Sequence, residues 1–214
     1  MSKKYIQEIL QLYAVTDRHW LGTQTLAQQV ESALKGGVTC VQLREKNLDK
    51  KLFLQEALEI KKICNYYHVP LLINDDIAIA LQSNADGVHV GQNDMPVEEV
   101  RKILGKNKII GVTVKTVEQA IYAQNNEADY LGVGAVFSTS TKTDAIKIEK
   151  ETIKAICKSV KIPIVAIGGI TQENILQLTE FDIQGVALVS AIFSSQDIEK
   201  TCRKLKILSK QIIN

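Results

Sequence analysis

Three polar side chains alternate along the short stretch QLREK (42–46). In an extended chain, alternate residues point to the same face, so Gln42, Arg44 and Lys46 are expected to converge there. Arg can form bidentate contacts with phosphate or carboxylate oxygens, and Lys supplies a point charge, so this face is suited to a polyanion. The alternative interpretation is a strand end whose charges are simply solvated, because charged residues are common there.

Acidic side chains follow the next two apolar runs of the sequence. Asp75 and Asp76 come after the first of these runs, and Asp94 ends the stretch HVGQND (89–94). Carboxylates from neighbouring strand ends can hold a Mg²⁺ ion that keeps several waters and also binds phosphates. Alternatively, Asp75 and Asp76 cap the helix that follows them. His89 is interpreted as a packed, hydrogen-bonded neighbour of the site and not as a ligand.

Glycines and a serine near the C-terminus predict a cup for a phosphate group. Gly168 and Gly169 end the stretch AIGG (166–169), and Ser190 lies in VSAI (189–192). Glycines let the backbone approach an oxyanion, and the N–H groups at a helix start donate hydrogen bonds. A glycine pair by itself usually marks only a turn, but the serine in the next unit strengthens the interpretation.

A hydroxyl-rich segment, STSTKT (138–143), precedes this region. It contains one cation, so it has the composition of a loop that closes over an anion. An ordinary surface loop would have the same composition, and the sequence leaves both interpretations open. Thr113, at the end of another apolar run, adds a further hydroxyl.

The elements that must position these side chains alternate regularly along the chain. Nearly continuous apolar runs predict strands covered on both faces, as in a parallel sheet. The predicted strands are 12–15, 38–43, 70–73, 87–90, 108–112, 130–135, 163–167 and 185–189. The predicted helices are 26–35, 51–66, 77–82, 97–104, 117–125, 151–158, 172–179 and 198–208.

Eight such strand–helix units predict an α/β fold, a single-domain (β/α)₈ TIM barrel over residues 1–214, with 1–11 as a short N-terminal helical extension. An open doubly wound sheet is the structural alternative, but no G-x-G-x-x-G motif follows the first strand. In a barrel, the C-terminal strand ends carry the chemistry. The polar residues described above follow those ends.

Composition excludes several other classes of protein. Lys and Arg number 26 and Asp and Glu 24, so the net charge is +2 and offers no electrostatic argument for a nucleic-acid or membrane partner. No apolar run approaches the length of a membrane span, and the N-terminus lacks the apolar core of a secretory signal. The cysteines are widely spaced and are interpreted as buried core residues, so we expect a reduced, cytoplasmic protein.

The motifs QLREK (42–46), ND (74–75), HVGQND (89–94), TSTK (139–142), AIGG (166–169) and VSAI (189–192) occur in one order. In this combination the sequence resembles the thiamine-phosphate synthase family, also called thiamine-phosphate pyrophosphorylase. The resemblance extends from YAVTD (13–17) to VSAIF (189–193). It implies a (β/α)₈ barrel that condenses a pyrimidine diphosphate with a thiazole phosphate, in the presence of Mg²⁺, to give thiamine phosphate and diphosphate.

The resemblance also implies roles for individual residues. It implies that the pyrimidine diphosphate is held by Gln42, Arg44, Lys46 and Asn74. It implies that Mg²⁺ is bound by Asp75 and Asp94, and that the leaving diphosphate is stabilised by Arg44, Lys46 and Lys142. It implies that ligand contacts also come from Thr113, Thr139, Ser140 and Thr141, and that the thiazole-phosphate cup is completed by Gly169, Val189 and Ser190.

Two other functions compete with this transferase. The first is a thiazole tautomerase-like barrel, which would not need Lys46, Asp75 and Asp94 together. The second is a non-catalytic phosphate-ligand binder on the same fold, because a fold does not fix a function. Retention of both carboxylates argues against the second, since neighbouring acids without a cation only repel each other.

Overall fold

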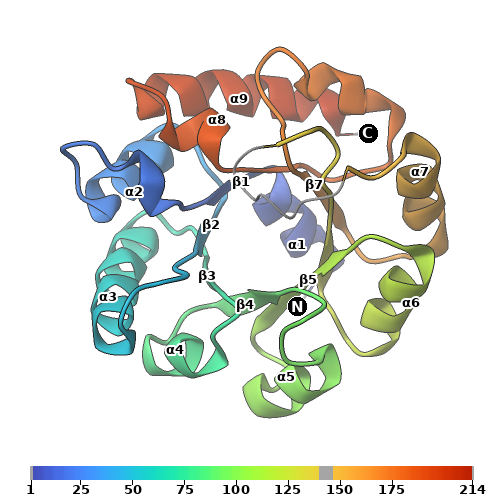
Figure 1. The fold of residues 1–214 in the computed structure, drawn as a ribbon, viewed down its shortest axis with the longest axis horizontal. Helices are drawn as coiled ribbons and strands as arrows, with labels where there is room; N and C mark the ends of the chain where they lie inside the picture. Colours follow the sequence, from blue (N-terminus) through green and yellow to red (C-terminus); the bar gives the residue numbers. More distant parts are fainter. Residues whose placement is uncertain (1, 140–146, 214) are drawn as a thin grey trace.

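The computed structural model describes residues 2–139 and 147–213. Within these residues, eight parallel strands pair in sequence order and close into a barrel, β1 to β8. The helices lie outside the barrel, and Figure 1 looks along its axis. The predicted (β/α)₈ fold is therefore confirmed.

The strands are β1 (Leu12–Val15), β2 (Cys40–Leu43), β3 (Leu71–Asn74), β4 (Gly87–Val90), β5 (Ile109–Val114), β6 (Tyr130–Val133), β7 (Ile164–Ile167) and β8 (Val186–Leu188). The α-helices are α1 (Lys3–Leu10), α2 (Leu26–Lys35), α3 (Lys50–Tyr66), α4 (Ile77–Gln82), α5 (Val97–Leu104), α6 (Val117–Asn125), α7 (Lys150–Ser159), α8 (Ser190–Phe193) and α9 (Ile198–Ile212). Two 3₁₀ helices, η1 (Arg18–Trp20) and η2 (Ile175–Glu180), complete the described elements.

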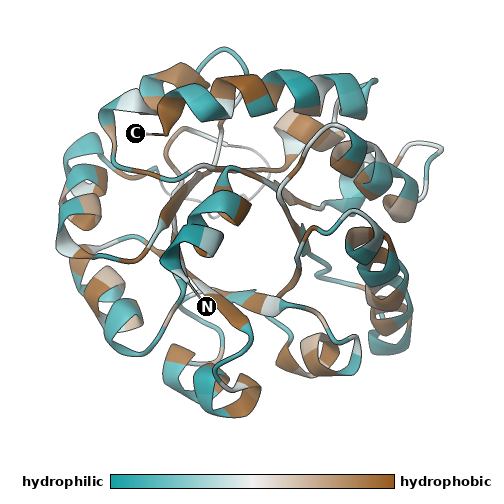
Figure 2. Cartoon of the chain, turned by 180° about the vertical axis from the view of Figure 1, so that it is seen from behind, coloured by the Kyte–Doolittle hydropathy of each residue, from teal (hydrophilic) through white to brown (hydrophobic). Residues whose placement is uncertain are grey.

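The strands are buried on both faces, which explains their nearly continuous apolar sequences. One large cluster of buried side chains fills the space between the sheet and the surrounding helices. Figure 2 shows these helices with apolar and polar residues on different sides. Burial between layers requires strands that are apolar on both faces and helices that are apolar on one face. The pattern in the sequence therefore agrees with the packing.

Helix α1 closes the N-terminal end of the barrel. In Figure 2 it lies across the opening of the barrel. Its buried residues Ile6, Ile9 and Leu10 pack in one cluster with side chains from the barrel interior. The Thr39 hydroxyl fixes the junction with β1, because it accepts a hydrogen bond from Leu12 N at 2.8 Å and contacts Ile9 O at 3.0 Å. The barrel therefore opens to a ligand at its other end.

Two predicted elements differ from the structure near the C-terminus. The helix expected at 172–179 is the 3₁₀ helix η2, and the strand expected to reach 189 ends at Leu188. The Asn174 side chain accepts a hydrogen bond from Thr171 N at 2.8 Å and donates one to Gly169 O at 2.8 Å. These bonds tie residues 169–174 into a turn, so the helical geometry begins later than the apolar pattern predicts.

Side-chain caps begin two of the helices near the cavity. Thr116 accepts a hydrogen bond from Gln119 N at the start of α6, and Asp76 accepts one from Ile79 N at the start of α4. Asp76 is therefore the helix cap that the alternative interpretation of the acidic pair proposed. None of the helices in the described part of the chain is both long enough and apolar enough to cross a membrane.

Close strand contact at Gly87 generates a stability prediction. A Cβ atom at Gly87 would lie 2.0 Å from Ile109 O, a backbone atom of the neighbouring strand, so the strands would have to separate. We expect Gly87→Ala to lower the free energy of unfolding by about 1–3 kcal/mol, measured by urea denaturation.

Gly22→Ala is the control for this variant. Gly22 meets no atom within 4 Å but has a φ of +56°, so Ala at this position costs only the backbone strain of a left-handed conformation, about 1–2 kcal/mol, with no contribution from packing. Equal stability of Gly87→Ala and the wild-type protein would contradict the packing argument.

Candidate active site

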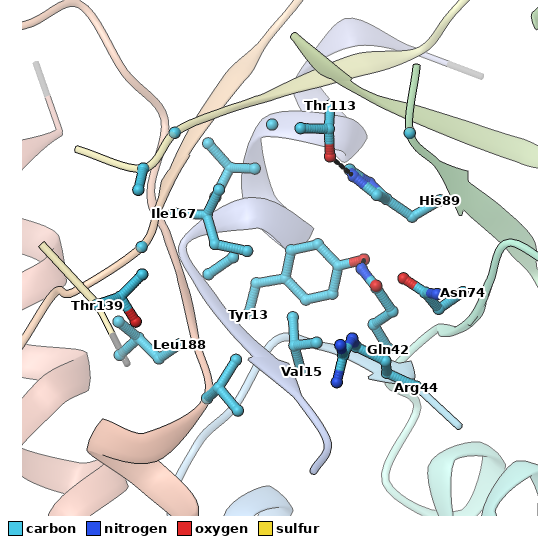
Figure 3. Close-up of a pocket in the computed structure, with 18 of the residues that line it drawn as sticks. Tyr13, Val15, Gln42, Arg44, Asn74, His89, Thr113, Thr139, Ile167 and Leu188 are labelled. Carbon is cyan, nitrogen blue, oxygen red and sulfur yellow. Dashed lines mark hydrogen bonds between the residues drawn. The ribbon is translucent and has the colours of Figure 1, made fainter. Parts of the chain in front are cut away.

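A cavity of about 360 Å³ opens at the C-terminal ends of the strands. It is lined by every described residue that the sequence predicted for the site: Gln42, Arg44, Lys46, Asn74, Asp75, Asp94, Thr113, Thr139, Gly169, Val189 and Ser190. Figure 3 shows several of these side chains directed toward one space. Ser140, Thr141 and Lys142 lie outside the residues that the structure describes.

The alternating residues after β2 face the cavity as the sequence predicted. Gln42 is only 3% exposed, and its Nε2 donates a hydrogen bond to the Tyr13 hydroxyl at 2.7 Å. Arg44 is partly buried, and its guanidinium lies 3.8 Å from an oxygen of Asp17. Glu45, which lies between Arg44 and Lys46 in the sequence, does not line the cavity and pairs with Arg18 at 3.1 Å. Alternation thus separates the side chains that face the cavity from a buried carboxylate that pairs with Arg18 away from it.

Lys46 and the acidic residues form the charged side of the cavity. Lys46 Nζ contacts Asp75 Oδ2 at 2.5 Å, and Asn74 Nδ2 donates to the same oxygen at 2.5 Å. Asp75 has a φ of +61°, a left-handed conformation that Asp tolerates better than most residues. This backbone turn separates Asp75 from its neighbour Asp76, which caps α4 instead.

The Asp94 carboxylate faces Asp75 across the mouth of the cavity. Its Oδ2 accepts a hydrogen bond from Gly91 N at 2.7 Å. Burial raises the pKa of Asp94, and the nearby Asp75 carboxylate raises it further, while Gly91 N–H and Lys46 act in the opposite direction. Two neighbouring carboxylates with Lys46 beside them form a site that is suited to a hard cation.

The opposite side of the cavity is formed by glycine-rich turns. Gly168 and Gly169 have φ values of +99° and +66°, and a Cβ at Gly169 would lie 2.3 Å from Ser138 O. Ser190 begins the short helix α8, directly after Val189. The first N–H groups of a helix have no acceptor within it, so this side offers backbone donors and a hydroxyl to a ligand.

His89 lies beneath the mouth and is not among the charged groups. It is 7% exposed, and burial lowers its pKa to about 4. Its two ring nitrogens contact the hydroxyls of Tyr130 and Thr113 at 2.8 and 2.7 Å. It is therefore the packed, hydrogen-bonded residue that the sequence analysis described.

Five polar residues that line the cavity were not predicted from the sequence: Tyr13, Gln92, Asn93, Lys115 and Gln119. Lys115 follows Thr113 at a spacing of two residues, the same alternation that identified Arg44 and Lys46. That spacing could have found Lys115. Tyr13 lies within an apolar strand, and nothing in its local sequence distinguishes it from a core residue.

The class that the fold and the cavity indicate is a (β/α)₈-barrel enzyme acting on small-molecule substrates at the C-terminal rim. A family model described as "Thiamine monophosphate synthase" matches residues 12–192. The chain belongs to the thiamine-phosphate synthase family, whose members are transferases.

Similar proteins extend over nearly the whole chain. The thiamine-phosphate synthase of Ruminiclostridium cellulolyticum is 54% identical over 91% of this chain and 92% of its own. The thiamine-phosphate synthase of Clostridium tetani is 50% identical over 91% of this chain and 93% of its own. The solved thiamine phosphate pyrophosphorylase of Pyrococcus furiosus superimposes with a TM-score of 0.89 at 33% identity, covering 98% of this chain and all of that one.

The raised pKa of Asp94 generates a prediction about stability and pH. The folded protein holds this proton more tightly than the unfolded chain does, so ionised Asp94 disfavours folding at every pH above its folded pKa. Asp94→Asn removes that unfavourable charge and keeps an oxygen for Gly91 N–H. With a chelator present, we expect the variant to be more stable than wild type at pH 7.

The advantage should shrink as the pH falls through the folded pKa of Asp94, because the wild-type carboxyl then becomes neutral as well. Urea unfolding at pH 7 and at about pH 4 measures the difference. An advantage that was the same at both values of pH would contradict the assignment to this carboxyl.

Proposed function

We propose that the chain condenses 4-amino-2-methyl-5-(diphosphooxymethyl)pyrimidine with 4-methyl-5-(2-phosphooxyethyl)thiazole to give thiamine phosphate and diphosphate. The observation that carries this proposal is that one cavity combines two chemically different sides. Cations and carboxylates gather at the ends of β2, β3 and β4, and glycine-rich turns with Ser190 gather after β7 and β8. Family membership supplies the pair of substrates that needs both sides.

The proposal assigns the pyrimidine diphosphate to the first side. Gln42 is buried and Asn74 is partly buried, so both are assigned to the ring. Arg44 and Lys46, whose side chains are more exposed than that of Gln42, are assigned to the diphosphate. The thiazole phosphate is assigned to Gly169, Val189 and Ser190. Thr139 lines the same cavity. The family resemblance assigns Ser140 and Thr141 to the thiazole phosphate and Lys142 to the diphosphate.

The acidic residues fit a Mg²⁺ ion. Asp75 and Asp94 face each other and supply the oxygen ligands that this ion prefers. In the described part of the chain, no group of three His, Cys, Asp or Glu side chains is placed to hold a metal. A Mg²⁺ ion held by two carboxylates keeps positions for water and phosphate, and when bound it neutralises charge on diphosphate oxygens.

The side chains of the protein can carry out the remaining chemistry by position and charge. When the C–O bond to diphosphate breaks, its electron pair leaves with the diphosphate, and Arg44, Lys46 and Lys142 stabilise that charge. The aminopyrimidine carries the positive charge at its exocyclic methylene. The thiazole nitrogen, held nearby through its phosphate, then forms the new C–N bond. This order of steps requires correct positioning and no covalent nucleophile.

A diphosphate-release assay tests the proposal. Both substrates and Mg²⁺ are supplied, each is omitted in turn, and thiamine phosphate is identified by mass. Release that needs all three components supports the transferase. Isomerisation of the thiazole phosphate without diphosphate release would favour the tautomerase-like alternative, and binding without any turnover would favour the non-catalytic binder.

The metal assignment predicts an altered dependence on Mg²⁺. Asp75→Asn should raise the Mg²⁺ concentration for half-maximal rate by at least about tenfold, because a carboxylate ligand is lost. Initial rates measured across a Mg²⁺ titration give this value. Asp76→Asn is a matched control, since Asn also caps helices well and Asp76 faces α4. An equal shift in both variants would contradict the assignment.

The two sides of the cavity predict a separation of Michaelis constants. Ser190→Ala should raise the KM for the thiazole phosphate about ten- to hundredfold, which corresponds to one lost hydrogen bond to a charged group, and leave the KM for the pyrimidine diphosphate unchanged. Ser194→Ala is the control, because the Ser194 hydroxyl bonds to Ser190 O at 2.6 Å and not to the cavity. A change confined to the pyrimidine substrate would reverse the assignment of the two sides.

The cellular and architectural expectations are also part of the proposal. We propose that the chain acts in the cytoplasm as one domain, with α1 as an N-terminal extension that plugs the barrel. The burial of three cysteines, Cys40, Cys64 and Cys202, supports a reduced environment, because they occupy apolar core positions without pairing.

A further inference from the structure

Five polar side chains form a hydrogen-bonded chain across the barrel interior. Gln42 Nε2 lies 2.7 Å from the Tyr13 hydroxyl, which lies 2.9 Å from the Tyr130 hydroxyl. The Tyr130 hydroxyl lies 2.8 Å from His89 Nδ1, and His89 Nε2 lies 2.7 Å from Thr113 Oγ1. Figure 3 shows Gln42 and Tyr13 at one end of this chain and His89 and Thr113 at the other.

The middle of the chain is isolated from solvent. Tyr13 and Tyr130 are completely buried, and they pack among apolar side chains of the barrel interior. Burying a hydroxyl without a partner is costly, so a chain in which each hydroxyl is bonded on both sides is the arrangement that the interior tolerates.

The backbone leaves room for this chain at two glycines. A Cβ at Gly111 would lie 2.1 Å from Tyr130 Cζ, and a Cβ at Gly132 would lie 3.1 Å from His89 Cε1. Any larger residue at position 111 would displace the Tyr130 ring. Two glycines on the neighbouring strands β5 and β6 therefore accommodate the tyrosine and the imidazole.

Each hydroxyl has one proton to donate, so the hydrogen-bonded chain can run in either of two directions. Tyr13 accepts from Gln42. The direction that continues from this bond has Tyr13 donating to Tyr130 and Tyr130 donating to His89 Nδ1. A neutral imidazole that accepts at Nδ1 carries its proton on Nε2 and donates it to Thr113 Oγ1. The Thr113 proton is then left for the cavity, and the Gln42 amide oxygen is left as an acceptor. The opposite polarity would need the Gln42 amide to be turned over.

We propose that Tyr13, Tyr130 and His89 are positioning residues that fix the hydrogen-bond polarity of Gln42 and Thr113. The cavity then presents an acceptor on β2 and a donor on β5. An aminopyrimidine has the complementary groups, an amine that donates and ring nitrogens that accept. This inference rests on the proposed function, since it deepens the recognition of the pyrimidine substrate by the same cavity.

The tautomer of His89 in the substrate-free protein is the first measurement. Nitrogen-15 NMR of the imidazole, assigned with His89→Gln, reports which ring nitrogen carries the proton. We expect protonated Nε2 and bare Nδ1. A proton on Nδ1 in the wild-type protein would overturn the proposed polarity.

The second measurement is the tautomer of His89 in a variant that should reverse the direction of the hydrogen-bonded chain. In Gln42→Glu a carboxylate replaces the amide, so it can only accept from Tyr13. Tyr13 must then accept from Tyr130, Tyr130 must accept from His89, and the imidazole proton is expected to move to Nδ1. The substitution replaces one side-chain nitrogen by oxygen and leaves both tyrosines in place. An unchanged tautomer would show that the chain does not transmit polarity and would overturn the proposal.

Kinetics of Tyr130→Phe test the consequence for substrate binding. Loss of the linking hydroxyl should raise the KM for the pyrimidine diphosphate about fivefold and leave the KM for the thiazole phosphate unchanged. Tyr122→Phe is the matched control, because that exposed tyrosine bonds to Glu98 at 2.6 Å away from the cavity. An unchanged pyrimidine KM in folded Tyr130→Phe would overturn the proposal; if this variant does not fold, the tautomer in Gln42→Glu decides.

The proposed function and the proposed role of the hydrogen-bonded chain can be tested separately. The NMR measurement needs no turnover, so wild-type protein with protonated Nε2 but without diphosphate release would overturn the proposed function alone. An active transferase with protonated Nδ1 would overturn the positioning chain alone.

Discussion

Closure of the parallel sheet is the constraint on which the rest of the structure depends. β8 pairs with β1 in the same direction as every other neighbouring pair, so all eight C-terminal strand ends meet at one rim. Residues that are distant in the sequence, such as Gln42 and Ser190, therefore line one cavity. Helix α1 fills the opposite end with apolar side chains, so a ligand can enter only from the rim.

Charge compensation organises the cavity. Lys46 contacts Asp75, and Asp75 in turn faces Asp94, so a cation and two carboxylates form one continuous group. Burial raises the pKa of Asp94, and the Asp75 carboxylate raises it further, so ionised Asp94 is unfavourable in the free protein despite the nearby lysine. A substrate that brings a diphosphate and a hard cation would supply the missing positive charge and, at the same time, give Arg44 and Lys46 an anion to bind. Under the proposed function, the excess negative charge that is unfavourable in the free protein would favour binding of the diphosphate together with its cation.

The hydrogen-bonded chain beneath the cavity concerns the direction in which the polar groups at the rim donate and accept. The rim must present hydrogen-bonding groups in a fixed sense, but an isolated hydroxyl or amide can rotate or turn over. A buried chain of tyrosines and a neutral histidine removes that freedom, because reversing any one member requires all of them to reverse. The glycines at positions 111 and 132 leave room in the backbone of two strands for the Tyr130 ring and the His89 imidazole.

The sequence by itself determined the strands, most helices and the set of polar residues at the strand ends. These features depend on side-chain period and on backbone hydrogen bonds between near neighbours, which a local pattern records. The turn at 169–174 escaped it, because the Asn174 side chain competes with the helix through Gly169 and Thr171.

Only the tertiary structure decided which of these polar groups meet. Lys46 and Asp75 are 29 residues apart, and Tyr13 and Tyr130 are 117 apart. Their contacts follow from the register of strands that pair around the whole barrel. Tyr13 in particular reads as a core residue, and its role depends on a partner that no local pattern reveals. A contact between distant residues is a property of the closed sheet, and it exists only once the barrel has formed.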